Sequence, residues 1–168
     1  MATIWVVVTD ANILINLIHV RHLSLLGRLI GFSFVVPDEV VAEVSEPEQE
    51  QALREALEAG ILTQESISDT AELELFATLT SSLGKGESAC LAIAQSRDWL
   101  VASDEGGAFR REATARLGAG RILNTAGLFL MAIRAGVISV EQADEAKAVL
   151  EQRRFRMKFG SFRDLTGE

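Results

Sequence analysis

The stretch VVVTDANILINL, residues 6–17, decides the fold that the sequence predicts. With the preceding Ile4 and Trp5, its valines form a continuous apolar run, which is typical of a strand buried on both faces of a parallel sheet. After Asp10 the apolar residues recur with a period nearer to that of a helix, so we expect a helix from Asp10 to His19. A carboxylate therefore stands where a buried strand ends. An N-cap role would explain Asp10 alone, so its meaning depends on whether other acids reach the same place.

The same alternation continues along the chain. We expect further strands at 32–37, 61–66, 99–103 and 121–123, and helices at 21–30, from 38 onward, and at 47–60, 69–82, 87–97, 106–117, 125–135 and 139–153. Strands that alternate with helices predict βα units and a parallel sheet. No linker-like stretch interrupts the pattern, so we expect a single domain over residues 1–168, with residues 153–168 as a basic C-terminal tail.

The composition excludes several classes of protein. The chain has 168 residues, of which 48% are hydrophobic, too many for a disordered protein. No apolar run reaches the roughly 20 residues of a membrane helix, and the start lacks the basic region of a signal peptide. Cys90 is the only cysteine, which excludes an internal disulfide and favours a cytoplasmic location. The net charge of −8 argues against binding nucleic acid by charge alone, but not against a nuclease whose carboxylates hold metal ions.

Acidic residues recur where the predicted strands end. In a parallel α/β sheet the cleft lies beyond the carboxyl ends of the strands. Asp10 follows the first strand, and Asp104 and Glu105 follow the fourth. Glu43 lies on the helix after the second strand, and Glu87 lies in the first turn of the helix that follows a glycine turn. We therefore expect these acids to meet at one edge of the sheet.

Clustered carboxylates repel one another unless a cation lies between them. Oxygen ligands suit Mg²⁺ or Mn²⁺, and such an ion activates water for phosphodiester hydrolysis. Each acid also has an ordinary explanation by itself: helix capping for Asp10 and Asp104, solvent exposure for Glu43, and the helix dipole for Glu87. The functional interpretation depends on one fold bringing them together.

At this point the sequence resembles the PIN-domain family of metal-dependent ribonucleases, in particular the toxin-like members of the VapC type. The resemblance covers roughly Ile4 to Leu150. It rests on VVTDANILINL, VVPDEVVAEV, LGKGESACLAIA and LVASDEGGAFRREA, which occur in the family's order. It implies a three-layer α/β/α fold with a central parallel five-stranded sheet.

The resemblance also implies roles for individual residues. Asp10, Glu43 and Glu87 match the family's first three metal-binding acids. Family members often have Thr-x-Asp or Thr-Asp-Asp at the fourth position, where this chain has Ser103-Asp104-Glu105. Asp104 is the preferred fourth ligand, and Glu105 is the alternative.

Several polar residues near these acids are candidates for contact with the substrate. Asn12 matches the small polar residue that often follows the first acid, and Ser103 takes the place of the hydroxyl residue that supports the fourth. Arg110 and Arg111 either contact phosphate near the metal or pair with neighbouring acids. The stretch RRFRMKFGSFR, residues 153–163, either contacts RNA or is an ordinary helix end and tail, and the second interpretation is preferred.

The predicted function is therefore an endoribonuclease dependent on Mg²⁺ or Mn²⁺, the toxin of a toxin–antitoxin pair. The resemblance implies RNA as substrate, a small antitoxin as partner, and a homodimer. Two alternatives stay open: a PIN-fold binding module with little nuclease activity, and a metal-dependent DNA nuclease or phosphatase that uses the same acids.

Overall fold

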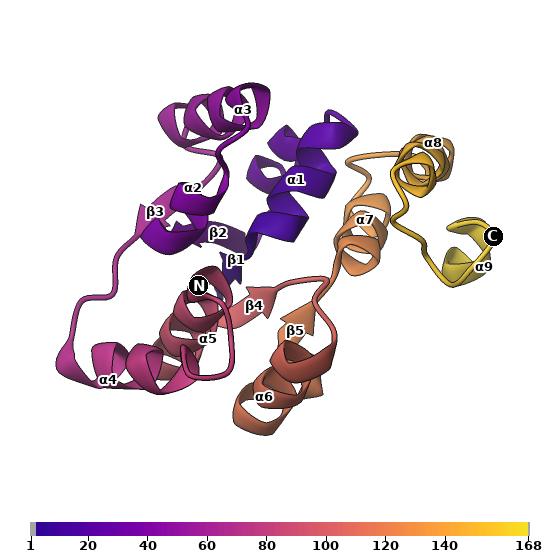
Figure 1. Ribbon diagram of the computed structural model, residues 1–168. Helices are drawn as coiled ribbons and strands as arrows, with labels where there is room; N and C mark the ends of the chain where they lie inside the picture. Colours follow the sequence, from indigo (N-terminus) through magenta and orange to yellow (C-terminus); the bar gives the residue numbers. More distant parts are fainter. Residues whose placement is uncertain (1–2, 168) are drawn as a thin grey trace.

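One parallel sheet forms the centre of the molecule. The computed structural model describes residues 3–167. The strands are β1 (Trp5–Thr9), β2 (Phe32–Pro37), β3 (Thr63–Glu65), β4 (Leu100–Ala102) and β5 (Ile122–Leu123). Their spatial order is β3-β2-β1-β4-β5, and each neighbouring pair is parallel (Figure 1). The predicted parallel five-stranded sheet is confirmed, and β1 is its central strand.

Helices cover both faces of this sheet, as the three-layer prediction requires (Figure 1). One layer contains α1 (Ala11–His19), α3 (Pro47–Glu58), α7 (Thr125–Arg134) and α8 (Val140–Gln152). The other contains α4 (Thr70–Leu79), α5 (Lys85–Arg97) and α6 (Gly107–Leu117). The short α2 (Asp38–Glu43) follows β2 and packs against α5, and α9 (Arg163–Thr166) packs against α7. The 3₁₀ helices η1 (Leu23–Gly27) and η2 (Ala119–Arg121) complete the elements of the described chain.

Strand β1 and helix α5 carry much of the core. Val7 and Val8 are fully buried because helices cover both faces of the sheet. Helix α5 packs against the sheet, α4 and α6, and the residues from Ala89 to Ala94 are all completely buried. A helix that is covered on all sides need not be amphipathic, and its small side chains allow close packing. The first turn of α5, which contains Glu87, is therefore held by a rigid element.

One predicted helix is wrong in extent. The sequence predicts a helix over residues 21–30, whereas the structure has only η1 at Leu23–Gly27. Arg21 has a left-handed backbone with φ of 61°, which interrupts any helix continuing from α1. Leu23, Leu25 and Leu26 are nevertheless buried, because the tighter 3₁₀ turn also directs them into the core.

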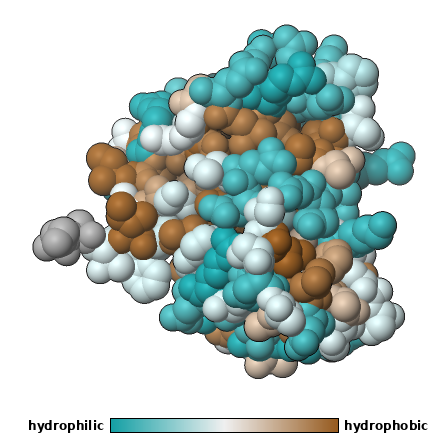
Figure 2. Space-filling view, turned by 90° about the vertical axis from the view of Figure 1, so that its left-hand side faces the viewer, coloured by the Kyte–Doolittle hydropathy of each residue, from teal (hydrophilic) through white to brown (hydrophobic). Residues whose placement is uncertain are grey.

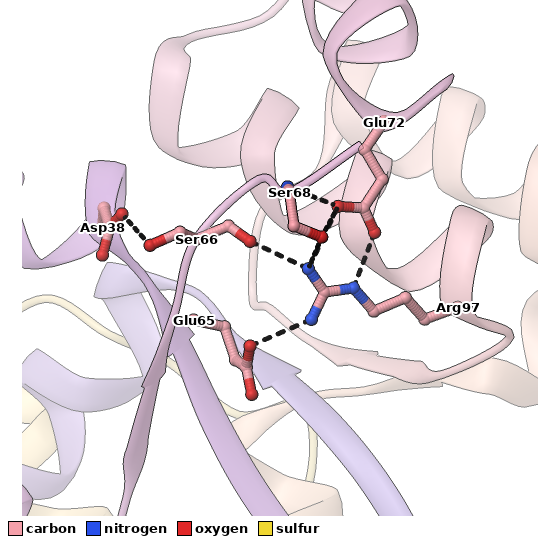
Figure 3. A network of polar contacts seen from close by, with 6 residues as sticks. All are labelled: Asp38, Glu65, Ser66, Ser68, Glu72 and Arg97. Atoms are coloured by element: carbon pink, nitrogen blue, oxygen red, sulfur yellow. Dashed lines mark hydrogen bonds and ion pairs between the residues drawn. The ribbon is translucent and has the colours of Figure 1, made fainter. Parts of the chain in front are cut away.

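A polar network around Arg97 holds the C-terminal end of α5 in place (Figure 3). The Arg97 guanidinium donates to Glu72 at 2.6 and 3.0 Å, to Glu65 at 3.0 Å and to the Ser66 carbonyl at 2.8 Å. The Glu72 side chain is 1% exposed, and the Arg97 hydrogen bonds hold its pKa below the usual value. Three segments, the end of β3, the loop after it and α4, are thereby joined to α5, which carries Glu87.

The C-terminal segment is packed rather than fully solvated. Phe162 is completely buried and contacts Phe129 and Phe159, with ring centroids 5.9 and 4.9 Å apart. Asp144 of α8 accepts hydrogen bonds from the Ser161 hydroxyl and the Phe162 amide at 2.6 and 2.8 Å. These contacts return the chain to the body of the domain after α8 ends.

The face that carries α3 and α4 has a mixed surface, and Figure 2 shows apolar side chains gathered between hydrophilic ones. Large apolar side chains that are exposed in the described chain include Ile4, Trp5, Ile30 and Leu73. Across residues 3–167, no helix combines the length and the apolar character that crossing a membrane requires.

Candidate active site

Two adjacent strands place the first residues of the site side by side. β1 and β4 are paired in parallel, with Thr9 opposite Ala102. The Asp10 amide donates to the Ala102 carbonyl at 3.0 Å, and the Ser103 amide donates to the Leu123 carbonyl at 2.9 Å. Asp10 and Ser103 therefore leave the sheet together at its carboxyl edge.

Asp10 is a buried carboxylate between β1 and α1. It caps α1 by accepting from the Ala11 amide at 2.8 Å, and its other oxygen accepts from the Ser103 hydroxyl at 3.1 Å. Its side chain has no cationic partner among the ion pairs of residues 3–167. Burial is the main cause that raises the pKa of Asp10 to about 6; the negative charges of Glu43 and Glu87 add to it, and these two hydrogen bonds oppose it. The residue is thus a cap and also a carboxylate whose negative charge is poorly compensated.

Glu43 and Glu87 reach the same place from two helices that pack together. Glu43 ends α2, and its carboxylate accepts from the Gly86 amide in the first turn of α5 at 2.9 Å. A Cβ atom on Gly86 would lie 2.6 Å from both Glu43 carboxylate oxygens, so only glycine permits this approach. Glu87 is half-buried, and burial followed by the charge of Glu105 and then that of Glu43 raises its pKa.

Asn12 links the end of β1 to the loop after β4. Its side-chain oxygen accepts from the Asp104 amide at 3.0 Å. Its side-chain nitrogen lies 3.4 Å from an Asp10 oxygen, 3.4 Å from the Ser103 hydroxyl and 3.3 Å from Glu105 Oε1. Asn12 and Ser103, both predicted to contact the substrate, are therefore engaged with the acids, and direct contact with a substrate stays a prediction.

The two candidates for the fourth acid point in different directions. Asp104 Oδ1 accepts from the Thr125 amide at 2.9 Å, and Oδ2 accepts from the Thr125 hydroxyl and, at 3.0 Å, from Asn16. Burial raises the Asp104 pKa, and these hydrogen bonds oppose that effect. Glu105 is exposed and has a charge that acts on Glu87. Protein donors thus occupy both Asp104 oxygens, whereas Glu105 is close to Asn12 and its charge raises the pKa of Glu87.

Asn16 and Thr125 also belong to this arrangement, and neither was predicted from the sequence. Asn16 follows Asn12 by one helical turn, so both lie on the same face of α1, and that spacing was a usable signal. Thr125 begins α7, 21 residues after Asp104. No local pattern predicts its contact with Asp104, because the contact depends on how β5 and α7 return to the edge of the sheet.

The two arginines of α6 differ in position. Arg110 lines a cavity of about 430 Å³ together with Ser103 and Asp104. Arg111 is exposed and lies outside the lining of that cavity. Arg110 is therefore a better candidate than Arg111 for contact with a phosphate near the acids.

The chemistry of the acids suits a hard divalent cation. Every side chain contributed by Asp10, Glu43, Glu87 and Glu105 is a carboxylate, and the raised pKa values of Asp10 and Glu87 reflect burial and mutual repulsion. A cation would remove that repulsion. Among residues 3–167, however, no three His, Cys, Asp or Glu side chains are already placed to enclose a metal ion. The residues fit a metal by charge and atom type, and binding would require their side chains to converge.

Comparison with known families decides what this fold and site belong to. A family model described as a PIN domain matches residues 6–165, nearly the whole chain. The chain belongs to the PIN-domain family. Comparisons with curated proteins and with solved structures gave no match. PIN domains are generally nucleases that use divalent metal ions. The acids at the carboxyl edge of this PIN domain are therefore the candidate nuclease site.

Proposed function

We propose that this PIN domain is an endoribonuclease dependent on Mg²⁺ or Mn²⁺, with Asp10, Glu43, Glu87 and Glu105 as the metal-binding acids. The observation that carries the proposal is the Asp10 carboxylate, which is 3% exposed and lies beside two further negative charges without a cationic partner in the described chain. An arrangement of this kind costs stability unless a cation binds. The nuclease character of the family makes phosphodiester hydrolysis the reaction that the site supports best.

The protein's own residues would orient these acids before any metal binds. Ala11 and Ser103 hold the two Asp10 oxygens, the Gly86 amide holds Glu43, and Asn12 lies within hydrogen-bonding distance of Glu105. A bound divalent ion would activate a water and stabilise negative charge on the phosphate. Arg110 is placed to hold a neighbouring phosphate, because it lines the cavity beside Asp104.

The choice of Glu105 over Asp104 rests on hydrogen bonding. Asp104 accepts three hydrogen bonds from Thr125 and Asn16, so binding a metal would cost it these partners. We propose that Asp104 fixes the loop after β4 to α7, and that Glu105 completes the metal site. Glu105→Gln would then lower Mn²⁺ affinity and cleavage by at least about 100-fold. Asp104→Asn would instead leave Mn²⁺ affinity and cleavage much closer to those of wild type, because the Asp104 side chain is engaged with Thr125 and Asn16. The reverse pattern in Mn²⁺ titrations and cleavage assays would assign the fourth position to Asp104.

The proposed activity is tested with purified protein and labelled single-stranded RNA. Wild type with Mn²⁺ should cut the RNA internally, and excess chelator should stop the reaction. Asp10→Asn should be inactive, whereas Asp98→Asn, a matched change at a side chain that is 91% exposed, should retain activity. If wild type with Mn²⁺ leaves RNA intact, the ribonuclease proposal is wrong. Cleavage of single-stranded DNA alone would reassign the substrate to DNA.

We further propose that the protein is the toxin of a toxin–antitoxin pair and forms a homodimer. The support is the resemblance of its motifs to toxin-like PIN domains. Expression in a bacterial host should arrest growth, and Asp10→Asn should relieve the arrest. A gene for a small protein beside its own, whose product restores growth, would identify the antitoxin. Sedimentation equilibrium would measure the dimer directly.

A further inference from the structure

A second feature lies beside the acids and is not explained by metal binding. The cavity of about 430 Å³ that includes Asp104 and Arg110 is also lined by the segment after α8. That segment contributes Phe155, Arg156, Met157, Lys158 and Phe159 to the lining. Cavities of roughly 300–1,000 Å³ are typical of small-molecule sites. We call this the basic pocket.

The cations of the basic pocket have no acidic partners. Among residues 3–167 no ion pair involves Arg110, Arg156 or Lys158, whereas Arg97 and Arg163 are both paired. All three pocket cations are exposed. In a chain of net charge −8, three unpaired cations around one cavity are a local excess of positive charge. Such an excess favours an anionic ligand.

The segment that carries two of these cations has an ordered alternation. Phe155, Met157 and Phe159 are half-buried and pack against the core, while Arg156 and Lys158 between them are exposed. The Phe155 amide donates to the Leu150 carbonyl at 2.9 Å before the segment, and the buried Phe162 anchors the chain after it. Arg156 and Lys158 therefore stand on a fixed wall, which argues against a solvated tail.

The basic pocket adjoins a second cavity that contains Glu105, one of the proposed metal-binding acids. A neighbouring cavity of about 320 Å³ is lined by Asn12, Glu105 and Phe155, and Asp104 lines both cavities. The two cavities thus adjoin at Asp104 and Phe155. A polymer that occupies both cavities would pass from Glu105 along Phe155 toward the three cations.

We propose that the basic pocket binds a nucleotide of a single-stranded RNA next to the scissile phosphate. Arg110, Arg156 and Lys158 hold its phosphates, and the half-buried Phe155 ring offers a surface on which a base can stack. The inference rests on the proposed function, since it names the substrate-binding half of the same site. It assigns a direct role to residues 155–158, which the preferred interpretation of the sequence treats as a helix end and tail.

Binding measurements test this separately from cleavage. Fluorescence anisotropy of a 5′-labelled single-stranded RNA is measured in the Asp10→Asn background with chelator, over a range of KCl concentrations. The Arg156→Ala/Lys158→Ala double variant should raise the Kd about tenfold at 0.1 M salt. It should also reduce the slope of log K against log salt by about 1.4, since each phosphate contact to a single strand contributes about 0.7.

The matched control removes two other exposed arginines, Arg28 and Arg134, which lie outside the basic pocket. Their double alanine variant should change the Kd less than twofold. Arg110→Gln, on a different helix, should weaken binding in the same way as the double variant and so guards against a local folding defect. An unchanged Kd and salt slope in both pocket variants would overturn the inference. If wild type does not cleave RNA, the proposed activity is wrong, but the binding measurement still tests the basic pocket independently.

Discussion

Replacing Asp10 by asparagine should stabilise the metal-free protein above neutral pH. Asp10 is 3% exposed, and its pKa in the folded protein is about 6, against an ordinary value of 3.8. The two values differ by about 2, and one pKa unit corresponds to 1.36 kcal/mol, so the folded state loses about 3 kcal/mol by ionising this group. Asparagine is a good N-cap and keeps an acceptor for the Ala11 amide. We therefore expect a gain of about 2–3 kcal/mol at pH 8.

The pH dependence fixes the sign of this effect. Because the folded pKa is raised, the folded state binds more protons than the unfolded chain between about pH 3.8 and 6. The contribution of Asp10 to stability is therefore complete below about 3.8 and is lost as the pH rises through 6. Asp10→Asn and wild type should therefore have similar stability near pH 4, separate between about pH 4 and 6, and keep a constant difference at higher pH.

Urea unfolding in excess chelator at pH 4, 6 and 8 measures the difference, with Asp98→Asn as an exposed control that should stay within about 0.5 kcal/mol of wild type. Added Mn²⁺ should stabilise wild type and leave Asp10→Asn almost unchanged, because only a protein with an intact site gains from a bound ion. A variant that is less stable than wild type at pH 8 in chelator would refute the argument. Such a result would mean that the hydrogen bonds to the Asp10 carboxylate stabilise the folded protein by more than the burial of its charge destabilises it.

Three further substitutions test the supports of the site. Gly86→Ala should lower cleavage by about 100-fold, because the new Cβ would lie 2.6 Å from the Glu43 oxygens and displace that carboxylate. The melting temperature should change little, since alanine favours the helix by about 1 kcal/mol relative to glycine. A normal kcat/KM for this variant would contradict the prediction. Arg97→Met should cost about 3–5 kcal/mol in urea unfolding by leaving the buried Glu72 unpaired, and adding Glu72→Leu should recover most of it. If the double variant is no more stable than Arg97→Met, the unpaired Glu72 charge is not the cause of the lost stability. Phe162→Ala should lower the free energy of unfolding by about 3–5 kcal/mol. It should also weaken RNA binding, since this buried ring anchors residues 155–159, which line the basic pocket. Measuring anisotropy at a temperature where the variant is folded separates the two effects.

Local patterns in the sequence predicted most of the elements and the candidate acids of the proposed site. Nearby residues alone mark the strand and helix ends near these acids. Examples are the apolar run before Asp10, the glycine turn before Glu87 and the apolar strand before Asp104 and Glu105. The parallel sheet then follows, because alternating strands and helices pack in few ways. Placement of these acids at one edge also follows, because parallel strands end on the same side.

The helix expected at residues 21–30 shows where such patterns fail. Leucines spaced for a helix also suit a 3₁₀ turn, and the left-handed Arg21 has no signature in the sequence. The order of the strands likewise depends on which faces pack against each other, not on any one segment.

The sequence by itself determined the fold class, and it predicted the candidate acids and the chemistry that a group of carboxylates favours, because residue type and period carry that information. Only the tertiary structure shows that Asp104 is hydrogen-bonded to Asn16 and Thr125, since these partners lie 88 and 21 residues away along the chain. Only it shows Arg156 and Lys158 lining a cavity with Asp104, because the burial of Phe162 folds the end of the chain back. Hydrogen bonds and packing between distant segments set the direction of a side chain, and no local pattern records them.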